Sequence, residues 1–151
     1  MTVPSMTRFD PATLLARAGP KVFARGEGYA NPGQVSLLSI APDRIVAEVY
    51  GSETYGVRLI GLGTDLDGNC DCPAFEDAGF CKHFVAVALL ANQLLEAGAE
   101  TDTLISDIRT YLASFTKDRL VDYVASLAES IPSLFRRLGY DADLEPREGW
   151  D

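Results

Sequence analysis

The chain has 151 residues, of which 47% are hydrophobic and 23% are charged, a composition typical of a soluble globular protein and not of a disordered one. Its longest apolar run, residues 84–91, is too short for a membrane-spanning helix. The formal net charge of -9 disfavours binding to nucleic acid, because such binding depends on Lys and Arg side chains that displace phosphate counterions.

The charge is unevenly distributed. Residues 1–90 carry seven Lys and Arg against ten Asp and Glu, whereas residues 91–151 carry six against twelve. The first residues lack the apolar segment of a secretory signal, and the three cysteines form no even set for disulfides. We therefore expect a cytoplasmic protein whose thiols stay reduced.

Two short helices are expected in the first part of the chain. Asp10 is a suitable N-cap and Pro11 a suitable first residue for a helix that ends at Gly19. Pro20 begins a second helix, which contains two glycines and is therefore expected to be short or irregular. The Asn-Pro-Gly sequence at 31–33 ends it.

After this second helix the period of the apolar residues changes to two, which is typical of β-strands. Three strands joined by tight turns are expected at 35–40, 45–50 and 55–60, and they would form an antiparallel meander. A fourth strand at 66–69 would carry the chain to Cys70.

The remainder of the chain has helical periodicity. One helix is expected from residue 82 to Ala97, and a second is expected to begin after Asp102, the last residue of a Thr-Asp cap. A third helix is expected to begin after Thr116, and a last one is expected to end at Gly139. The apolar residues of the third helix are expected to face inward: Leu120, Val121, Val124, Leu127 and Ala128.

All three cysteines and the only histidine lie within fourteen consecutive residues, as Cys70, Cys72, Cys81 and His83. Three thiolates and one imidazole are a complete tetrahedral shell for one structural Zn²⁺ ion. Cys70 and Cys72 would share one face of a strand. In a regular helix Cys81 and His83 would lie about 200° apart. We therefore expect Cys81 just before the helix, near its cap, and His83 in the first turn.

Roles without zinc are less consistent with these four residues. Buried cysteines can be simple apolar side chains, and thiolates also bind iron–sulfur clusters. A catalytic pair of one nucleophilic cysteine and a histidine base is disfavoured, because the two other cysteines nearby would compete for any zinc. A catalytic zinc ion is disfavoured as well, because four protein ligands leave no coordination position for an activated water. We therefore expect no enzyme and no catalytic residues.

The Cys-x-Cys and Cys-x-His pairs, followed by an apolar helix, resemble the SWIM-type zinc finger. The resemblance spans roughly residues 22–92, and residues 112–138 are similar to a helical tail of bacterial members. Its flanking residues are Arg25, Gly26, Tyr29, Gly33, Val35, Val49, Gly51, Ser52, Tyr55 and Val57. The resemblance implies that Cys70, Cys72, Cys81 and His83 bind zinc.

SWIM modules bind DNA or other proteins, and some occur beside chromatin-remodelling-type ATPase or helicase domains. This chain contains no Gly-rich phosphate loop, so any such ATPase would be a separate partner. We expect a non-catalytic zinc-binding interaction module that mediates protein–protein contacts. The alternative is a DNA- or RNA-binding zinc module, whose basic patch would comprise Lys21, Arg25, Arg44, Arg58 and Lys82.

The expected fold class is α+β. A small antiparallel β-sheet would follow N-terminal helices, a zinc site would join the sheet to a helix, and a C-terminal helical tail would complete the chain. The expected limits are 1–98 for the zinc-binding module, with its metal segment at 66–90, then 99–140 for an appended helical segment and 141–151 for an acidic tail.

Overall fold

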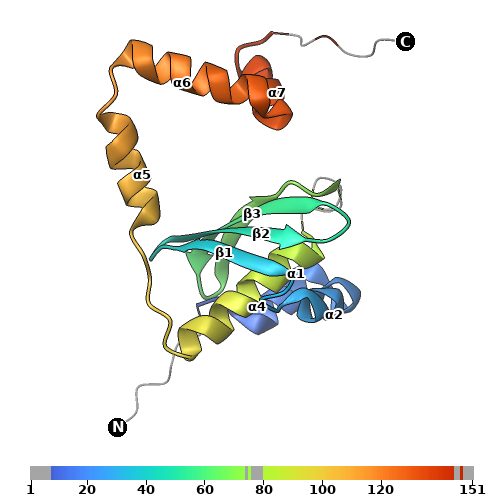
Figure 1. Ribbon diagram of the computed structural model, residues 1–151. Coiled ribbons are helices and arrows are strands. Elements are labelled where there is room, and N and C mark those ends of the chain that lie inside the picture. Colours follow the sequence, from blue (N-terminus) through green and yellow to red (C-terminus); the bar gives the residue numbers. More distant parts are fainter. Residues whose placement is uncertain (1–7, 74, 76–79, 145–146, 148–151) are drawn as a thin grey trace. The chain divides into compact units, whose positions relative to one another are not determined.

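The computed structural model describes residues 8–73, 75, 80–144 and 147. The chain divides into two compact units, Met1–Ile105 and Ser106–Asp151, which are described separately (Figure 1). Most of the expected acidic tail, and residues 74 and 76–79 of the expected metal segment, lie outside the described residues. The domain limits derived from the sequence stay predictions.

Both helices expected near the N-terminus are present. Helix α1 is Pro11–Ala18, and the Asp10 side chain accepts a hydrogen bond from the Thr13 amide as its N-cap. Gly19 follows with a φ of +82°, a conformation that glycine adopts without steric cost. Helix α2 is Pro20–Tyr29.

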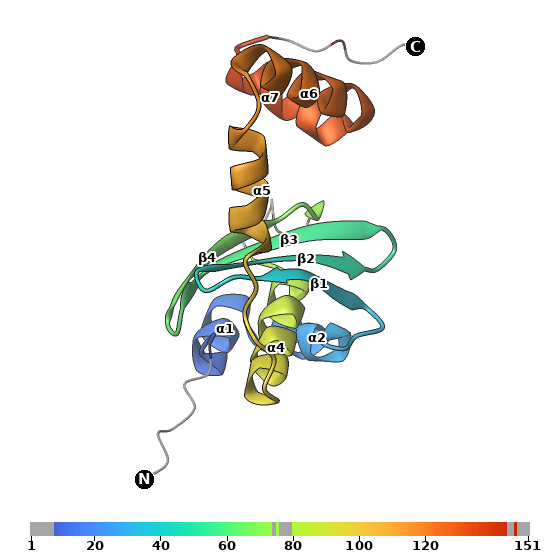
Figure 2. The same ribbon diagram turned by 60° about the vertical axis from the view of Figure 1, so that its left-hand side comes forward.

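The four expected strands form one antiparallel sheet in the order β1-β2-β3-β4. They are β1 Val35–Ile40, β2 Arg44–Tyr50, β3 Thr54–Leu62 and β4 Asp65–Cys70. Helices α1, α2 and α4, the last comprising Lys82–Glu96, lie on one face of this sheet, as Figures 1 and 2 show from two directions. The expected α+β class, with N-terminal helices and an antiparallel sheet, is confirmed.

Alternation along the strands decides which side chains meet α4. In β2, Ile45, Ala47 and Val49 are buried, and the register pairs the first two with Leu59 and Val57 of β3. Because alternate residues of a strand share one face, these side chains form a continuous apolar layer. The α4 residues buried with this layer include Phe84, Val85, Ala88 and Ala91.

Helices α2 and α4 approach each other closely at a glycine. A Cβ atom on Gly26 would collide with both Cβ and Cγ1 of Val85, which is fully buried. The glycine expected to weaken α2 is therefore what allows the two helices to pack at this distance.

A buried asparagine connects the start of the described chain to α4. Asn92 donates from Nδ2 to the Phe9 carbonyl at 2.7 Å and accepts from the Phe9 amide at 2.9 Å. Both backbone groups of Phe9 are thus satisfied in the core, where an unpaired polar group is costly.

The segment after α4 returns to the edge of the sheet. The Asp102 carboxylate accepts hydrogen bonds from Ser39 Oγ at 2.6 Å and from the Ile40 amide at 2.9 Å, and the Asp102 amide donates to the Ile40 carbonyl. Asp102 also accepts from the amide of Leu104, as expected for a residue before a helix. These hydrogen bonds cover part of β1, which is an edge strand of the sheet. The sequence pattern does not predict this contact.

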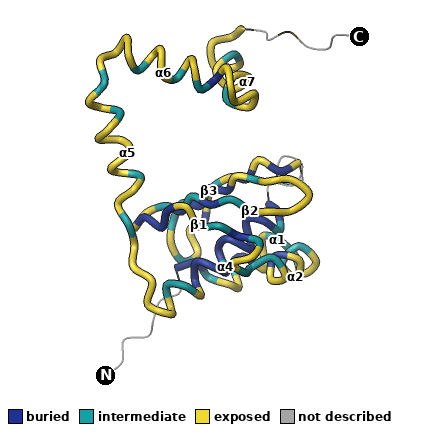
Figure 3. The backbone as a smooth tube through the Cα atoms, viewed as in Figure 1, coloured by how far each residue is buried: buried dark blue, intermediate teal, exposed yellow. Residues whose placement is uncertain are grey.

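The second unit contains most of α5, which is Leu104–Ala113, together with α6, Lys117–Ser130, and α7, Pro132–Asp141. Thr116 caps α6 by accepting from the Arg119 amide, as expected. Figure 3 shows that these helices are largely exposed.

The prediction that five apolar residues of α6 face inward was wrong in part. Val121 is 56% exposed, and of the five only Ala128 is buried. Packing within the unit explains this result, because α6 packs mainly on the short α7, and one helix covers only a narrow seam of another. None of the helices in the described ranges combines the length and apolar composition that crossing a membrane requires.

Candidate metal centre

The β3–β4 hairpin brings Cys70 to the inner face of the sheet. Cys70 is the last residue of β4, and the register pairs it with buried Val57. Two residues earlier, Gly68 has a φ of +140°, and a Cβ atom there would collide with the Arg58 carbonyl oxygen. Only glycine fits this close approach of the two strands, so Gly68 helps to set the position of Cys70.

Asp71 holds the turn that leads to Cys72. Its amide donates to the Gly56 carbonyl at 3.1 Å, and its carboxylate accepts from the Gly56 amide at 2.9 Å. The Cys72 carbonyl then accepts from the Phe75 amide, so the chain curls immediately after the strand. This turn gives Cys72 a buried position beside Cys70.

The second pair of residues lies at the beginning of α4, as the sequence predicts. Cys81 is the N-cap, with extended backbone, and its sulfur accepts a hydrogen bond from the Phe84 amide. His83 is the second residue of the helix, in its first turn. The expected placement of the Cys/His cluster between the sheet and a helix is confirmed.

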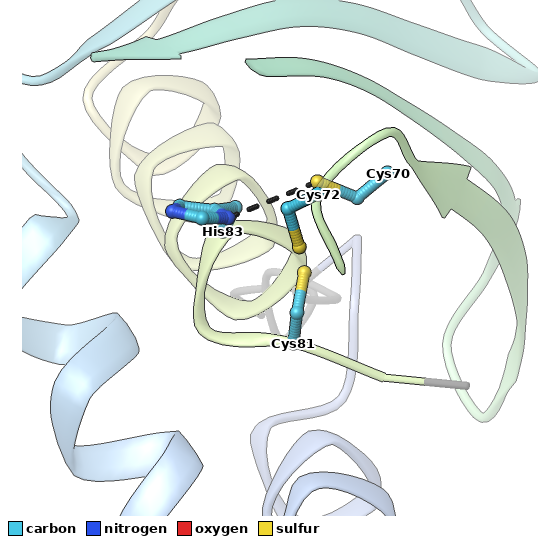
Figure 4. Close-up of side chains that lie close together, drawn as sticks. All are labelled: Cys70, Cys72, Cys81 and His83. Carbon is cyan, nitrogen blue, oxygen red and sulfur yellow. Dashed lines mark hydrogen bonds between the residues drawn. The ribbon is translucent and has the colours of Figure 1, made fainter. Parts of the chain in front are cut away.

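Figure 4 shows the four side chains converging from β4, the following turn and α4. One ligand atom of each residue lies within 4.8 Å of all the others, and all four residues are buried. A tetrahedral zinc shell places its donor atoms roughly 3.5–3.8 Å apart, given Zn–S bonds of about 2.3 Å. Small adjustments would therefore close the cluster around one ion, and the donor chemistry fits Zn²⁺.

The three thiols differ in acidity. Hydrogen bonding from the Cys70 thiol, and secondarily from His83 and the Phe84 amide, lowers the pKa of Cys81 to about 4. The same interaction with Cys81, together with burial, raises the pKa of Cys70. Burial also raises the pKa of Cys72. Without metal, Cys81 at the helix N-terminus is therefore the favoured thiolate.

The comparison with protein families agrees with this geometry. Residues 59–92 match the family model described as SWIM zinc finger. This segment is similar to SWIM zinc fingers. The match runs from β3 through the four converging residues and into α4. Comparison with curated proteins and with solved structures finds no match to the chain.

Four protein donors fill the shell of a Cys₃His zinc finger. Because no coordination position remains for water or a substrate, the single Zn²⁺ ion of such a finger has a structural role. Its chemical contribution here is to fix the end of β4 to the beginning of α4.

Two tyrosines from outside the matched segment contact the histidine of the cluster. Tyr55 stacks on His83 with ring centroids 4.6 Å apart, and Tyr29 meets the same imidazole edge-on at 5.8 Å. The sequence pattern is consistent with packing or base stacking by these tyrosines and does not predict their contact with the metal site. Tyr50, a third tyrosine of the sheet region, is 43% exposed on the other face of the sheet.

The structure distributes the five basic residues of the alternative nucleic-acid patch over two faces. Lys21 and Arg25 belong to α2, and the Lys82 ammonium lies 4.8 Å from the centre of the Tyr29 ring. Arg44 and Arg58 belong to β2 and β3 at positions that alternate with the buried residues, on the face opposite the helices.

Proposed function

We propose that the chain is a non-catalytic zinc-binding module that recognises a partner protein. The observation that carries this proposal is the exposure of large apolar side chains in the helices of the second unit and in the residues that flank them. Contiguous exposed apolar surface is typical of protein interaction sites. The exposed side chains are Ile108, Tyr111, Val121, Tyr123, Ile131, Phe135, Leu138, Tyr140 and Leu144.

A groove within the second unit gives this surface a shape. Its volume is about 440 Å³, and its lining residues come from α6, α7 and the turn after α7. They include Ala125, Phe135 and Leu138, and also Glu129, whose carboxylate could pair with a basic group of a partner. Apolar grooves with a few polar groups are typical binding sites for partner helices.

The charge distribution supports a protein partner over nucleic acid. The net charge is -9, and the five basic residues of the alternative patch are divided between two faces. Binding to a phosphate backbone gains its free energy from several Lys and Arg residues acting together.

The resemblance to the SWIM family suggests the class of partner. Because SWIM modules accompany helicase and remodelling-type ATPase domains, a separate chain with such a motor is the partner proposed here.

Capture from native cytosol, with the zinc-loaded chain as bait, tests this function. We expect one protein to be captured reproducibly, and the Phe135→Ser/Leu138→Ser variant to lose it, whereas Arg136→Ser on the same helix retains it. Mass spectrometry of the captured protein then tests whether it has an ATPase domain. Equal capture by all three baits would contradict the proposed surface.

Gel shifts with duplex DNA and with RNA over a salt series test the alternative. Binding through the basic residues would show affinity that falls steeply with salt and weakens on Lys82→Ala or Arg58→Ala. Such binding at physiological salt, combined with no protein capture, would overturn the proposed function in favour of a nucleic-acid-binding module.

A further inference from the structure

The His83 imidazole presents its two nitrogens to different surroundings. Nδ1 lies 3.8 Å from the Cys70 sulfur, on the side of the three thiols (Figure 4). Nε2 faces the turn between β2 and β3, because a Cβ atom on Gly51 would lie 3.7 Å from it. The nitrogen available to the metal is therefore Nδ1.

The plane of the ring matters as much as the choice of nitrogen. An imidazole nitrogen donates to a metal through a lone pair in the ring plane, so tilting the ring turns the lone pair away from the ion. A histidine in the first turn of a helix retains rotational freedom about its side-chain bonds unless its neighbours restrict it. Some contact must hold the imidazole plane toward the cysteines.

Tyr55 provides this contact. Its ring is 25° from parallel to the His83 ring at a centroid distance of 4.6 Å, and the register of β2 and β3 pairs it with buried Val49 on the inner face. The Tyr55 hydroxyl lies 3.1 Å from Ser52 Oγ, across the turn that joins the two strands. The sheet thus fixes the tyrosine ring, and the tyrosine ring covers one face of the imidazole.

Tyr29 restricts the imidazole from a second direction. Its ring is nearly perpendicular to His83, at 88°, and the Lys82 ammonium lies over the same ring. An edge contact and a stacking contact together leave the imidazole little freedom to tilt.

From this arrangement we infer that Tyr55 is a positioning residue of the zinc site, which holds His83 so that it binds Zn²⁺ through Nδ1. The inference rests on the metal site and not on the identity of the partner. Removing the Tyr55 ring leaves His83 restricted only by the edge contact with Tyr29 and by the metal. Residues that orient metal ligands typically change metal affinity by about 10–100-fold, and we expect the lower end, roughly tenfold, for a stacking contact.

Three variants separate the ring from its surroundings. Tyr55→Leu retains apolar volume but removes the aromatic face, and Tyr55→Phe retains the face but removes the hydroxyl. Tyr50→Leu removes the exposed tyrosine of the opposite sheet face as a matched control. Zinc affinity is measured by competition with a chelator, and the absorption spectrum of the cobalt-substituted protein reports the geometry of the ligand shell.

We expect Tyr55→Leu to bind zinc roughly tenfold more weakly and to alter the cobalt spectrum, whereas Tyr55→Phe and Tyr50→Leu match the unmodified chain. A merely structural residue would change stability but not the cobalt spectrum of the folded, metal-bound protein. Unchanged affinity and spectrum in Tyr55→Leu, or an equal loss in Tyr55→Phe, would overturn the assignment of this role to the ring.

NMR of the unmodified chain tests the choice of nitrogen even if Tyr55→Leu fails to fold. The ¹³C shifts of the His83 ring, and its coupling to bound ¹¹³Cd, distinguish coordination through Nδ1 from coordination through Nε2. Nδ1 coordination supports the inference, and Nε2 coordination overturns it. Neither measurement involves a partner, so failure here leaves the proposed function to its own test.

Discussion

The Cys81 sulfur lies 3.4 Å from the backbone nitrogen of Phe84, so one cysteine is both part of the metal cluster and the N-cap of α4. A thiolate at this position interacts favourably with the positive end of the helix dipole. Metal binding at this cluster would therefore be coupled to the start of the helix through a single side chain.

Serine and alanine substitutions separate the two roles of Cys81. Serine is a good N-cap but a poor zinc ligand, so Cys81→Ser should keep the metal-free helix intact while losing stabilisation by zinc. Cys81→Ala should lose both, and its metal-free form should be about 1 kcal/mol less stable than that of the serine variant. Urea unfolding with and without zinc measures these differences. Full stabilisation of Cys81→Ser by zinc would show that Cys81 is not a ligand.

Zinc uptake should release protons. The pKa values of Cys70 and Cys72 are raised, so both thiols are protonated without metal, whereas the pKa of Cys81 is about 4 and its thiol is ionised. Since zinc binds thiolates, we expect about two protons to be released per ion near neutral pH, and affinity to fall as the pH is lowered. Calorimetry in buffers with different ionisation enthalpies counts the protons. Release of no proton would contradict coordination by Cys70 and Cys72.

Removal of zinc should have a local effect. Structural zinc contributes an apparent ~10–16 kcal/mol in finger peptides, but those peptides have no other core. Here Val85, Ala88 and Leu90 of α4 are buried in the hydrophobic core of the first unit, which the metal does not form. Hydrogen exchange after chelation should show loss of protection at residues 70–72 and 81–84, and retained protection in β2 and in the second half of α4. Uniform loss across the sheet would instead show that the whole unit needs the metal.

Local sequence patterns predict much of this structure, because its strands and helix ends are determined by interactions between residues that are close in the chain. Alternation gives the strands, the Asp10 and Thr116 caps give helix starts, and the angular argument places Cys81 before α4. The stacking of Tyr55 on His83 depends on the register of a hairpin against a distant helix, which no short pattern encodes. Similarly, helical periodicity identifies the apolar side of α6 but not whether another element covers it.

The contact of α2 with α4 also depends on distant parts of the chain, and two glycines of α2 test it. A Cβ atom on Gly26 would collide with Val85, so Gly26→Ala should destabilise the first unit by about 1–3 kcal/mol through overpacking. A Cβ atom on Gly28 meets no atom within 4 Å, so Gly28→Ala should stabilise the same helix by about 0.5–1 kcal/mol. If the packing is correct, urea unfolding will show changes of opposite sign in the free energy of unfolding of the two variants. A shared sign would contradict it.

The hydrogen bonds between Asp102 and β1 predict a dependence of stability on pH. Hydrogen bonds from Ser39 and the Ile40 amide lower the pKa of Asp102 below its value in the unfolded chain. A lowered pKa gives stabilisation that is complete above the unfolded-state pKa and is lost as the pH falls through the folded-state pKa.

Asp102→Asn should therefore reduce the free energy of unfolding by about 1 kcal/mol at neutral pH, because the partly exposed charge-assisted hydrogen bonds are weakened. The difference from the unmodified chain should shrink in acid, once Asp102 itself is protonated. Urea unfolding of both proteins from neutral to acidic pH measures it, with Asp122→Asn on exposed α6 as the control. A difference that stays constant with pH would mean that the charge of the Asp102 carboxylate contributes nothing to this contact.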